Sequence, residues 1–492
     1  MTRRFALATL SLSVLVVAAG TRPLPASPLP PRLQQTDWPT YGFDVERSGS
    51  NPTETLLGPG TVGRLHLLWR TSLGAATITS PTVAARVSAD GSERMLVFVG
   101  TEHGDVDAVD AADGRVVWRD HLGSVKTTCY DMPGDTFGVS GTPVIDRSTG
   151  RLYVAASDGA HDRVGVYALD LATGRVAPGW PVTVSGDPRH MNVWGALTLW
   201  RGTLYVPLAS LCDFAPSYGR VVAIDAASGR TRDTWYAVHR HGAVVGGGGI
   251  WGSGGVLVDP ATGAVFVATG NALPPGPQDQ PFGERVVRLS PDLRVVQSNH
   301  PPLAGRDVDF GSTPVLLRAP GCPPQLAVEN KSGALLVYAQ GRIAAGPVQR
   351  LQVGANASRD GRGIFIGLPA YSPTDGLLVV SNPGPDDPPF THGVIAFRVG
   401  TDCTASLSWQ RALGPDGTTP VSSSTVANGV VYAADGAGGR VFALDATDGR
   451  PLWDSGRTLR GAVFAPPVVV DGRLFVAAWD GGAGGDLYAF GP

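Results

Sequence analysis

Short apolar stretches separated by polar turns run along most of the chain, and residues 104–118 (GDVDAVDAADGRVVW) show the pattern clearly. Apolar and polar residues alternate through DVDAVD, as expected for a half-buried β-strand. Asp110 can accept a backbone N–H at the start of a turn, and Gly114 can take the left-handed conformation that ends it. The pattern predicts a β-hairpin, with Trp118 on its second strand.

The same phrase returns three more times, as ALDLATGR at residues 168–175, AIDAASGR at 223–230 and ALDATDGR at 443–450. A hairpin phrase that recurs at long intervals is typical of a repeat architecture. We therefore interpret its aspartates as turn formers and the tryptophans of the strands that follow as packing between repeats. These residues are Asp110, Asp170, Asp225 and Asp445, and Trp118, Trp235, Trp409 and Trp453.

Each repeat is consistent with four strands over about 50 residues. The last repeat begins near Pro466 and lacks its outer Trp-bearing strand, whereas residues 65–73 (LHLLWRTSL) form a lone strand with no hairpin before it. We expect an all-β fold, an eight-bladed β-propeller of four-stranded antiparallel blades spanning residues 37–492. The strand at 65–73 would complete the last blade and close the ring. A linear β-solenoid is the alternative.

The N-terminal residues have a different character. Arg3 and Arg4 precede an apolar stretch, and small residues follow it, so residues 1–20 are predicted to be an export signal, with an uncleaved anchor as the alternative. Residues 21–36 are Pro-rich and predicted to be a disordered leader. The polar, aromatic segment 37–52 shows no strand alternation, and we expect it to pack across the domain surface.

Charge and cysteine content narrow the functional classes. The net charge is −3 and no basic run occurs, which argues against nucleic acid and against a membrane-surface patch. We expect no transmembrane segment after signal removal, and a secreted or periplasmic location. Four cysteines in an exported chain favour disulfides, and we predict Cys129–Cys212 and Cys322–Cys403. The other pairings and four free thiols stay open.

Four short segments depart from the repeat pattern at loop positions, where a propeller usually carries its function. Trp251 lies in a glycine run (GGGGIWGSGG), and Asn271 ends the strand phrase ATGN. The segment RDVDFG carries Asp307 and Asp309. Finally, ENKSG carries Asn330 and Lys331, and Lys331 is one of only two lysines in a chain that otherwise uses arginine. Taken singly, these are a packing Trp, a turn Asn and a surface cation; their order and spacing suggest more.

These segments resemble the pyrroloquinoline-quinone (PQQ) repeat proteins, the quinoprotein alcohol dehydrogenases, including the polyvinyl alcohol dehydrogenase type. The resemblance covers roughly residues 38–492 and also implies eight blades. It implies that Trp251 stacks on PQQ, that Lys331, with Asn330 beside it, bonds the quinone oxygens, and that Ca²⁺ is bound. Asn271 and Asp309 would bind Ca²⁺, and Asp309, with Asp307 as second choice, would take the alcohol proton.

The chain also departs from that family's pattern. It has no adjacent cysteine pair, no acid in MNVWGALTLW (residues 191–200) where a glutamate ligand is expected, and no CxxCH haem motif. Electrons from a small or polymeric alcohol would therefore pass to an external acceptor.

Two other functional classes remain. The competing class is a non-catalytic scaffold or ligand-binding propeller with an envelope protein partner, for which the candidate residues should not converge. A third, lyase or hydrolase chemistry at His190, His241 or His392, lacks a nucleophile beside a base.

Overall fold

The computed structural model describes most of the chain after the leader. The described residues are 36–129, 132–239, 245–273, 281–303, 307–354, 366–384, 388–414, 421–436 and 438–492. The predicted export signal and all but the last residue of the predicted leader lie outside them. Among the described helices, none has the length and apolar character that a membrane crossing requires.

The fold is all-β. Within the described residues, seven four-stranded sheets and one five-stranded sheet follow one another along the chain, and we number them 1 to 8. Sheet 1 consists of β3 (Thr82–Ala89), β4 (Ser92–Gly100), β5 (Asp105–Asp110) and β6 (Val116–His121), and sheet 2 of β9 (Val144–Asp146), β10 (Arg151–Asp158), β11 (Arg163–Asp170) and β12 (Val182–Ser185). Sheet 3 consists of β13 (Thr198–Trp200), β14 (Thr203–Leu208), β16 (Arg220–Asp225) and β17 (Thr231–Tyr236). Sheet 4 consists of β19 (Leu257–Val258), β20 (Val265–Ala268), β22 (Val286–Leu289) and β23 (Val295–Asn299).

Sheets 5 to 8 continue the series. Sheet 5 consists of β25 (Val315–Leu317), β26 (Gln325–Asn330), β27 (Ala334–Ala339) and β28 (Gln349–Gln352), and sheet 6 of β30 (Ala370–Ser372), β31 (Leu377–Asn382), β32 (Gly393–Val399) and β33 (Ala405–Ala412). Sheet 7 consists of β34 (Thr425–Ala427), β35 (Val430–Asp435), β36 (Arg440–Asp445) and β37 (Pro451–Asp454), with β1 (Ser50–Asn51) added. Sheet 8 consists of β38 (Val468–Val470), β39 (Arg473–Trp479) and β40 (Gly485–Gly491), with β2 (His66–Ser72) added.

The remaining elements are short. Three small sheets are formed by β7 (Val125–Lys126) with β8 (Thr136–Phe137), by β15 (Ser217–Tyr218) with β18 (Gly246–Gly247) and β21 (Ala272–Leu273), and by β24 (Gly311–Ser312) with β29 (Ile366–Gly367). The 3₁₀ segments are η1 (Val62–Arg64), η2 (Pro133–Asp135), η3 (Gly159–His161), η4 (Leu211–Asp213) and η5 (Gln340–Ala345).

The repeated turn phrase forms the socket for a tryptophan of the preceding sheet. In the β5–β6 hairpin the Asp110 carboxylate accepts the Ala112 N–H at 2.8 Å, as predicted, and Gly114 has a φ of +77°. A Cβ on Gly114 would lie 2.7 Å from the ring of Trp69 on β2. The same contact recurs between Trp118 and the turn of sheet 2, so the tryptophans of the outer strands do pack between repeats.

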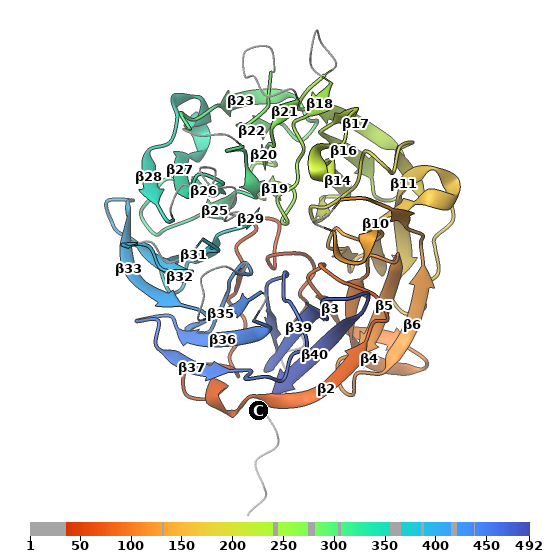
Figure 1. Ribbon diagram of the computed structural model, residues 1–492, viewed down its shortest axis with the longest axis horizontal. Coiled ribbons are helices and arrows are strands. Elements are labelled where there is room, and N and C mark those ends of the chain that lie inside the picture. The colour runs from red at the N-terminus through yellow and green to blue at the C-terminus, as the bar shows by residue number, and fades with distance from the viewer. Residues whose placement is uncertain are drawn as a thin grey trace, which may run out of the picture. The chain divides into compact units, whose positions relative to one another are not determined.

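Among the described residues, eight of the ten hydrophobic clusters each lie between two successive sheets, and the other two are small. Seven of them join sheets 1 to 8 in order, and the eighth joins sheet 8 to sheet 1 through residues such as Phe475 and Val97. The lone strand expected at residues 65–73 is β2, and it pairs with β40 in antiparallel register, His66 opposite Gly491 and Ser72 opposite Asp486. Figure 1 shows the sheets around a common centre, and in sheets 4 and 5 the first strands, β19 and β25, lie nearer this centre than the last strands, β23 and β28.

The segment 37–51 does not pack across the domain surface, and that expectation was wrong. It lies among the innermost strands, which it meets in chain order (Figure 1). The backbone of each first strand, or the residue before it, hydrogen-bonds to this segment. The pairs are Trp38 with Val83, Pro39 with Ile145, Thr40 with Leu197, Val45 with Val258, Glu46 with Leu316, Ser48 with Tyr371, Gly49 with Val426 and Asn51 with Val469. The segment satisfies the inward-facing strand edges, which the pattern of hydrophobic residues does not reveal.

Arg47 fixes this segment at the centre. Its side chain is fully buried, and burial lowers its pKa to about 10. The guanidinium donates to the carbonyls of Tyr41 at 2.8 Å, Val256 at 3.2 Å and Leu197 at 3.2 Å, and also to two threonine hydroxyls. A single buried cation thus connects the segment to sheets 3 and 4.

Both predicted disulfides are present. Cys129–Cys212 joins the segment after β7 to η4, and Cys322–Cys403 joins the β25–β26 connection to the β32–β33 turn. The Cα–Cα distances are 5.6 and 5.5 Å. The second bridge joins the neighbouring sheets 5 and 6 through these two connections.

Replacing Arg47 should destabilise the fold strongly. In Arg47→Met the apolar side chain leaves several buried acceptors without donors, and we expect a loss of about 3 kcal/mol or more in the free energy of unfolding. Urea unfolding followed by tryptophan fluorescence measures it. The matched control is Arg64→Met at an exposed arginine, for which we expect a change within about 0.5 kcal/mol. Equal stabilities of the two variants would contradict the central role of Arg47.

Candidate functional site

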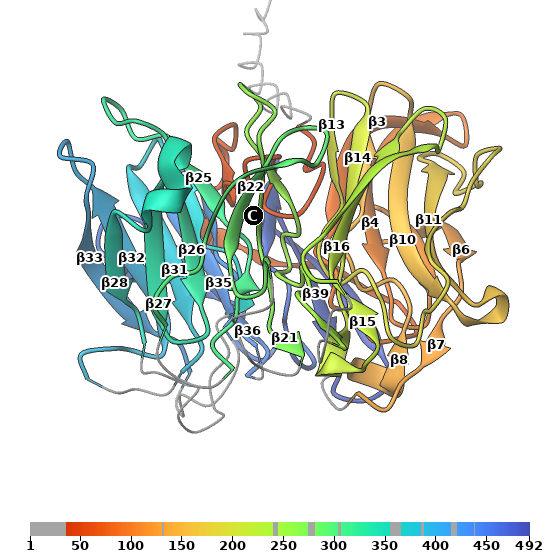
Figure 2. The same ribbon diagram turned by 90° about the horizontal axis from the view of Figure 1, so that it is seen from above.

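The candidate residues lie in connections at one end of the sheets. Trp251 lies between β17 and β19, Asn271 between β20 and β21, and Lys331 directly after β26. Asp307 and Asp309 precede β24. Connections between second and third strands fall at the same end of each sheet, and Figure 2 shows β7, β8, β15 and β21 gathered at that end.

Asp309 is the centre of the group. It is 2% exposed, and its Oδ2 accepts the indole N–H of Trp251 at 2.9 Å and the backbone N–H of Asn271 at 3.2 Å. Its Oδ1 lies 2.6 Å from the Nζ of Lys331. Three separate segments of the chain therefore converge on one buried carboxylate. We call Trp251, Asn271, Asp307, Asp309 and Lys331 the aspartate–lysine site.

Lys331 and Asp307 complete the site toward solvent. Nζ of Lys331 lies 2.8 Å from Asp307 Oδ1, and it also lies 4.8 Å from the centre of the Trp251 ring. The Asp307 side chain is 63% exposed, and its Oδ1 also accepts the side-chain N–H of Asn271 at 2.6 Å. The ammonium is thus held between two carboxylates and against an aromatic ring.

Asn330 holds the backbone of the Asp309 loop in place. It is fully buried, and its amide donates to the carbonyls of Val308 at 2.5 Å and Asp309 at 3.1 Å. Its amide oxygen accepts the N–H of Ser332 at 2.9 Å. These contacts hold the aspartate loop against the end of β26, so in this structure Asn330 positions Asp309.

Two glycines let the ring of Trp251 approach closely. A Cβ on Gly311 would lie 2.6 Å from the ring, and one on Gly270 would lie 3.1 Å from both Trp251 Nε1 and Asp309 Oδ2. Any larger residue at Gly311 would displace the ring. Both glycines lie outside the glycine run around Trp251, so the space for the indole ring comes from other segments of the chain.

The charges of the site shift one another. Burial raises the pKa of Asp309 to about 6, although the Lys331 ammonium opposes this. Burial alone would lower the pKa of Lys331, but the two carboxylates outweigh it, so the pKa is raised and the ammonium stays charged. Burial raises the pKa of Asp307, yet the Lys331 contact prevails and the net shift is downward. The group therefore carries one positive and two negative charges when Asp309 is ionised.

Asp213 is a residue that the repeat pattern did not single out. It follows Cys212 of the first disulfide, and desolvation raises the pKa of its carboxyl while Lys331 lowers it. Both Cys212 and Asp213 have left-handed backbone, with φ of 55° and 51°. The disulfide thus fixes a further carboxylate in the electrostatic range of Lys331. Its sequence signal was its place beside a cysteine in an irregular loop.

A second overlooked acid is Glu329, one residue before Asn330. It is 3% exposed on β26, and burial raises its pKa to about 8. Among the described residues no donor reaches its Oε1. An acid inside the apolar strand phrase QLAVEN was the available signal.

The histidines of the third functional class do not assemble. His190 pairs with Asp187 at 2.7 Å, and His392 is buried with Nδ1 3.0 Å from the Gly384 carbonyl. His241 lies outside the described residues.

Comparison with known proteins places the chain in a family. Residues 65–269 and 399–490, more than half of the chain, match the family described as outer membrane protein assembly factor BamB. The chain belongs to this family. It is a PQQ-like propeller protein, as its sequence phrases predicted.

Curated relatives of this family member include alcohol-oxidising enzymes. The quinohemoprotein alcohol dehydrogenase of Comamonas testosteroni is 24% identical over 58% of this chain and 41% of its own length. The polyvinylalcohol dehydrogenase of Sphingopyxis sp. (strain 113P3) is 25% identical over 49% of this chain and 37% of its own. The chain thus matches about two fifths of the length of these relatives.

Solved structures show the same fold. The Comamonas testosteroni quinohemoprotein alcohol dehydrogenase has a TM-score of 0.67 at 17% identity, covering 92% of this chain and 80% of its own. BamB from Moraxella catarrhalis has a TM-score of 0.55 at 15% identity, covering 87% of this chain and 100% of its own. The likeness extends to an enzyme and to an assembly factor, so the fold alone does not choose between them.

The residues of the aspartate–lysine site fit, in kind, the PQQ and Ca²⁺ that the resemblance to quinoprotein alcohol dehydrogenases implies. The half-buried ring of Trp251 offers a flat apolar surface, and Lys331 offers a cation beside it. Asp307, Asp309 and the side-chain oxygen of Asn271 are hard oxygen donors of the kind that Ca²⁺ prefers. The Lys331 ammonium competes for both carboxylates. Asp307, as the exposed partner, is the one that can turn from the ammonium to a metal ion.

Replacing Glu329 should change how stability depends on pH. An unfolded glutamate has a pKa of 4.5 and the folded one about 8, so between these values only the folded state holds the proton and stability falls as pH rises. Glu329→Gln removes this slope, and we expect it to gain at least about 1.4 kcal/mol relative to the parent between about pH 5 and pH 8. Urea unfolding at both pH values measures it.

The control for this experiment is Glu93→Gln at an exposed position of β4, which should leave the slope unchanged. Parallel pH profiles of the parent and Glu329→Gln would contradict a buried neutral Glu329.

Proposed function

We propose that the aspartate–lysine site binds PQQ with Ca²⁺ and that the chain oxidises an alcohol, passing electrons to an external acceptor. The observation that supports this is the convergence of Trp251, Asn271 and Lys331 on Asp309, from connections far apart in the sequence. PQQ and Ca²⁺ binding requires these four residues to meet, whereas a cofactor-free propeller does not require it. The curated relatives are quinoprotein alcohol dehydrogenases, which adds to the proposal.

The protein side of the reaction follows from the charges. Oxidation of an alcohol to a carbonyl removes the hydroxyl proton and a hydride. With a pKa of about 6, Asp309 is ionised at neutral pH and can take the proton. Lys331 stabilises the ionised carboxylate, Trp251 and Asn271 orient it, and Asp307 is the second candidate base. PQQ, when bound, supplies the hydride acceptor.

Charge balance makes Ca²⁺ part of the proposal. The site carries two carboxylates and one ammonium, with Asp213 nearby, so an anionic quinone with carboxylate groups would be repelled. A divalent cation reverses that balance and supplies a Lewis acid. We expect PQQ binding to require Ca²⁺.

We further propose the architecture and location that this function needs. Sheets 1 to 8 would be the blades of one closed eight-bladed propeller, residues 37–492, with β2 completing the last blade. The pairing of β2 with β40 and the cluster between sheets 8 and 1 support closure. Residues 1–20 would direct export and 21–36 form a leader. Two disulfides support an oxidising, extracytoplasmic compartment.

One observation favours a second function, a cofactor-free binding propeller with an envelope protein partner. Lys331 already neutralises Asp309 from within the chain, so the cluster is stable as an ion-pair network with no ligand. The family description, an assembly factor, agrees with this.

Titration with PQQ separates the two functions. With Ca²⁺ present, we expect PQQ to quench tryptophan fluorescence saturably, and a chelator to abolish the quenching. With a small alcohol or polyvinyl alcohol and an artificial dye acceptor, we expect dye reduction. Asp309→Asn should lower the rate about 10²–10⁴-fold. Asp170→Asn, in a turn of sheet 2, is the control with unchanged rate. If neither quenching nor dye reduction is observed, PQQ binding is contradicted and the cofactor-free propeller is the remaining function.

The pH profile of the reaction should report Asp309. Below a pKa of about 6 the carboxyl is protonated and cannot act as a base, so the rate should rise as pH increases through about 6. The initial rate of dye reduction at saturating PQQ measures this. A rate that is flat across this range would contradict Asp309 as the base.

A further inference from the structure

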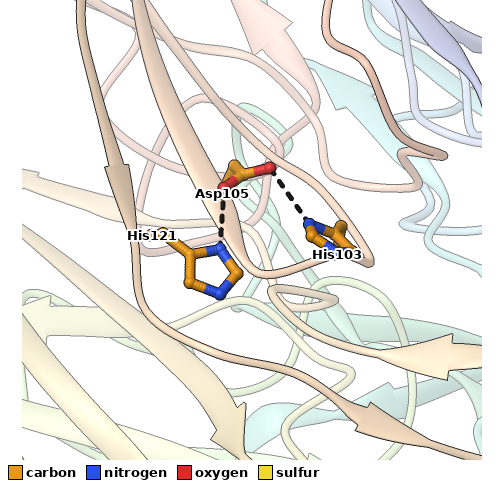
Figure 3. Close-up of side chains that lie close together, drawn as sticks. All are labelled: His103, Asp105 and His121. Atoms are coloured by element: carbon orange, nitrogen blue, oxygen red, sulfur yellow. Dashed lines mark hydrogen bonds and ion pairs between the residues drawn. The ribbon is translucent and has the colours of Figure 1, made fainter.

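Two histidines and an aspartate lie together on sheet 1, apart from the aspartate–lysine site that the connections around sheets 4 and 5 build. Asp105 begins β5 and His121 ends β6, and the register places these two residues directly opposite each other. His103 precedes Asp105 by two residues. Figure 3 shows both imidazole rings directed at the Asp105 carboxylate from its two sides.

The ligand atoms of the three side chains are close. His121 Nδ1 lies 2.8 Å from Asp105 Oδ1, and His103 Nδ1 lies 3.5 Å from Asp105 Oδ2. One ligand atom from each residue lies within 4.8 Å of the other two. Ligands on a tetrahedral zinc ion are about 3.3 Å apart, given Zn–N distances of about 2.0 Å. The His103 and His121 side chains are 64% and 54% exposed, so both rings can turn to close this gap.

The backbone beneath the trio is fixed. Gly104 has a φ of +92°, and a Cβ there would lie 2.0 Å from the Gly123 carbonyl oxygen. Its carbonyl accepts the Leu122 N–H at 2.8 Å. This glycine contact ties the loop of His103 to the strand end of His121, so the relative position of the two histidines does not depend on a ligand.

Among the described residues, His103 and His121 are the ion-pair partners of the Asp105 carboxylate. The neighbouring pair on the same face is Asp107 with Arg119, and the Arg119 guanidinium bonds both Asp107 oxygens, one of them at 3.0 Å. The Asp120 carboxylate accepts the backbone N–H of His121 at 3.1 Å. No arginine or lysine among the described residues forms an ion pair with Asp105.

Other histidines in the chain show what a simple pair looks like. His161 contacts Asp158 at 2.7 Å, and His190 contacts Asp187 at 2.7 Å, each with a single ring. Within the described segments, the trio is the one group of three such side chains with its ligand atoms this close. A hydrogen-bonded pair needs only one imidazole ring. A second ring at the same carboxylate provides the further ligand that a metal site requires.

We propose that His103, Asp105 and His121 bind a divalent transition-metal ion of the zinc type. Imidazole nitrogens suit Zn²⁺, Cu²⁺ and Ni²⁺, and zinc also accepts a carboxylate oxygen, whereas Ca²⁺ and Mg²⁺ prefer oxygen alone. Three protein ligands leave at least one coordination position for water or another donor. The site is accessible from solvent and independent of PQQ.

Calorimetric titration of the tag-free, metal-stripped full chain with ZnCl₂ tests this proposal. We expect saturable binding of one zinc ion that excess Ca²⁺ does not displace. His103→Ala, His121→Ala and Asp105→Asn should each weaken zinc binding at least about tenfold. Circular dichroism and the thermal midpoint without metal establish that each variant is folded.

Two controls make the test specific. His161→Ala removes an exposed histidine of similar exposure with one aspartate partner, and Asp309→Asn alters the aspartate–lysine site; both should bind zinc like the parent. Absence of saturable zinc binding would overturn the proposal. So would zinc binding that survives loss of both His103 and His121, or binding that falls equally in His161→Ala.

Discussion

The hydrogen bonding of residues 38–51 to the first strand of every sheet is the interaction on which the rest of the structure depends. A sheet whose first strand faces the centre of a ring exposes unpaired backbone groups there, and leaving them unsatisfied in a dry interior is costly. One segment supplies partners to sheets 1 through 8 in order. Arg47, fully buried, holds that segment with its guanidinium. The chain therefore fills its own centre at the end where this segment lies, and the candidate chemistry lies in the strand connections.

The aspartate–lysine site shows how repeat units give rise to a single unrepeated site. Each sheet contributes the same kind of connection, and within the part of the chain that the structure describes those around sheets 4 and 5 bring a carboxylate, a lysine and an indole together. Ionised Asp309 would be costly to bury without Lys331, and burial would lower the pKa of Lys331 if the carboxylates did not raise it. Each group therefore favours the charged form of the other. The same ion pair serves a base that needs a nearby cation or a network that needs no ligand, and this is why cofactor binding decides between the two functions.

The zinc-type trio and the aspartate–lysine site differ in how they are built. The trio uses two directly opposed strand positions and a residue two places away, so its geometry is local to one hairpin. The aspartate–lysine site depends on segments up to 80 residues apart, from Trp251 to Lys331, and on glycines that admit the indole ring. Perturbations of the fold should therefore disturb the geometry of the aspartate–lysine site before that of the trio.

The sequence by itself determined the all-β repeat, the hairpin turns with their aspartates and glycines, the outer tryptophans and the resemblance to the PQQ-like family. It predicted both disulfide pairings, but only the structure excluded the alternatives. These follow from short-range patterns that repeat, so each copy supports the others. It also pointed to Trp251, Asn271, Asp309 and Lys331, because they break the pattern. Tertiary structure alone decided the central path of residues 37–51, the partners of Arg47, the supporting position of Asn330, the nearness of Asp213 and the burial of Glu329. These depend on contacts between segments whose own sequences carry no periodic signal, so only the packed chain brings them together.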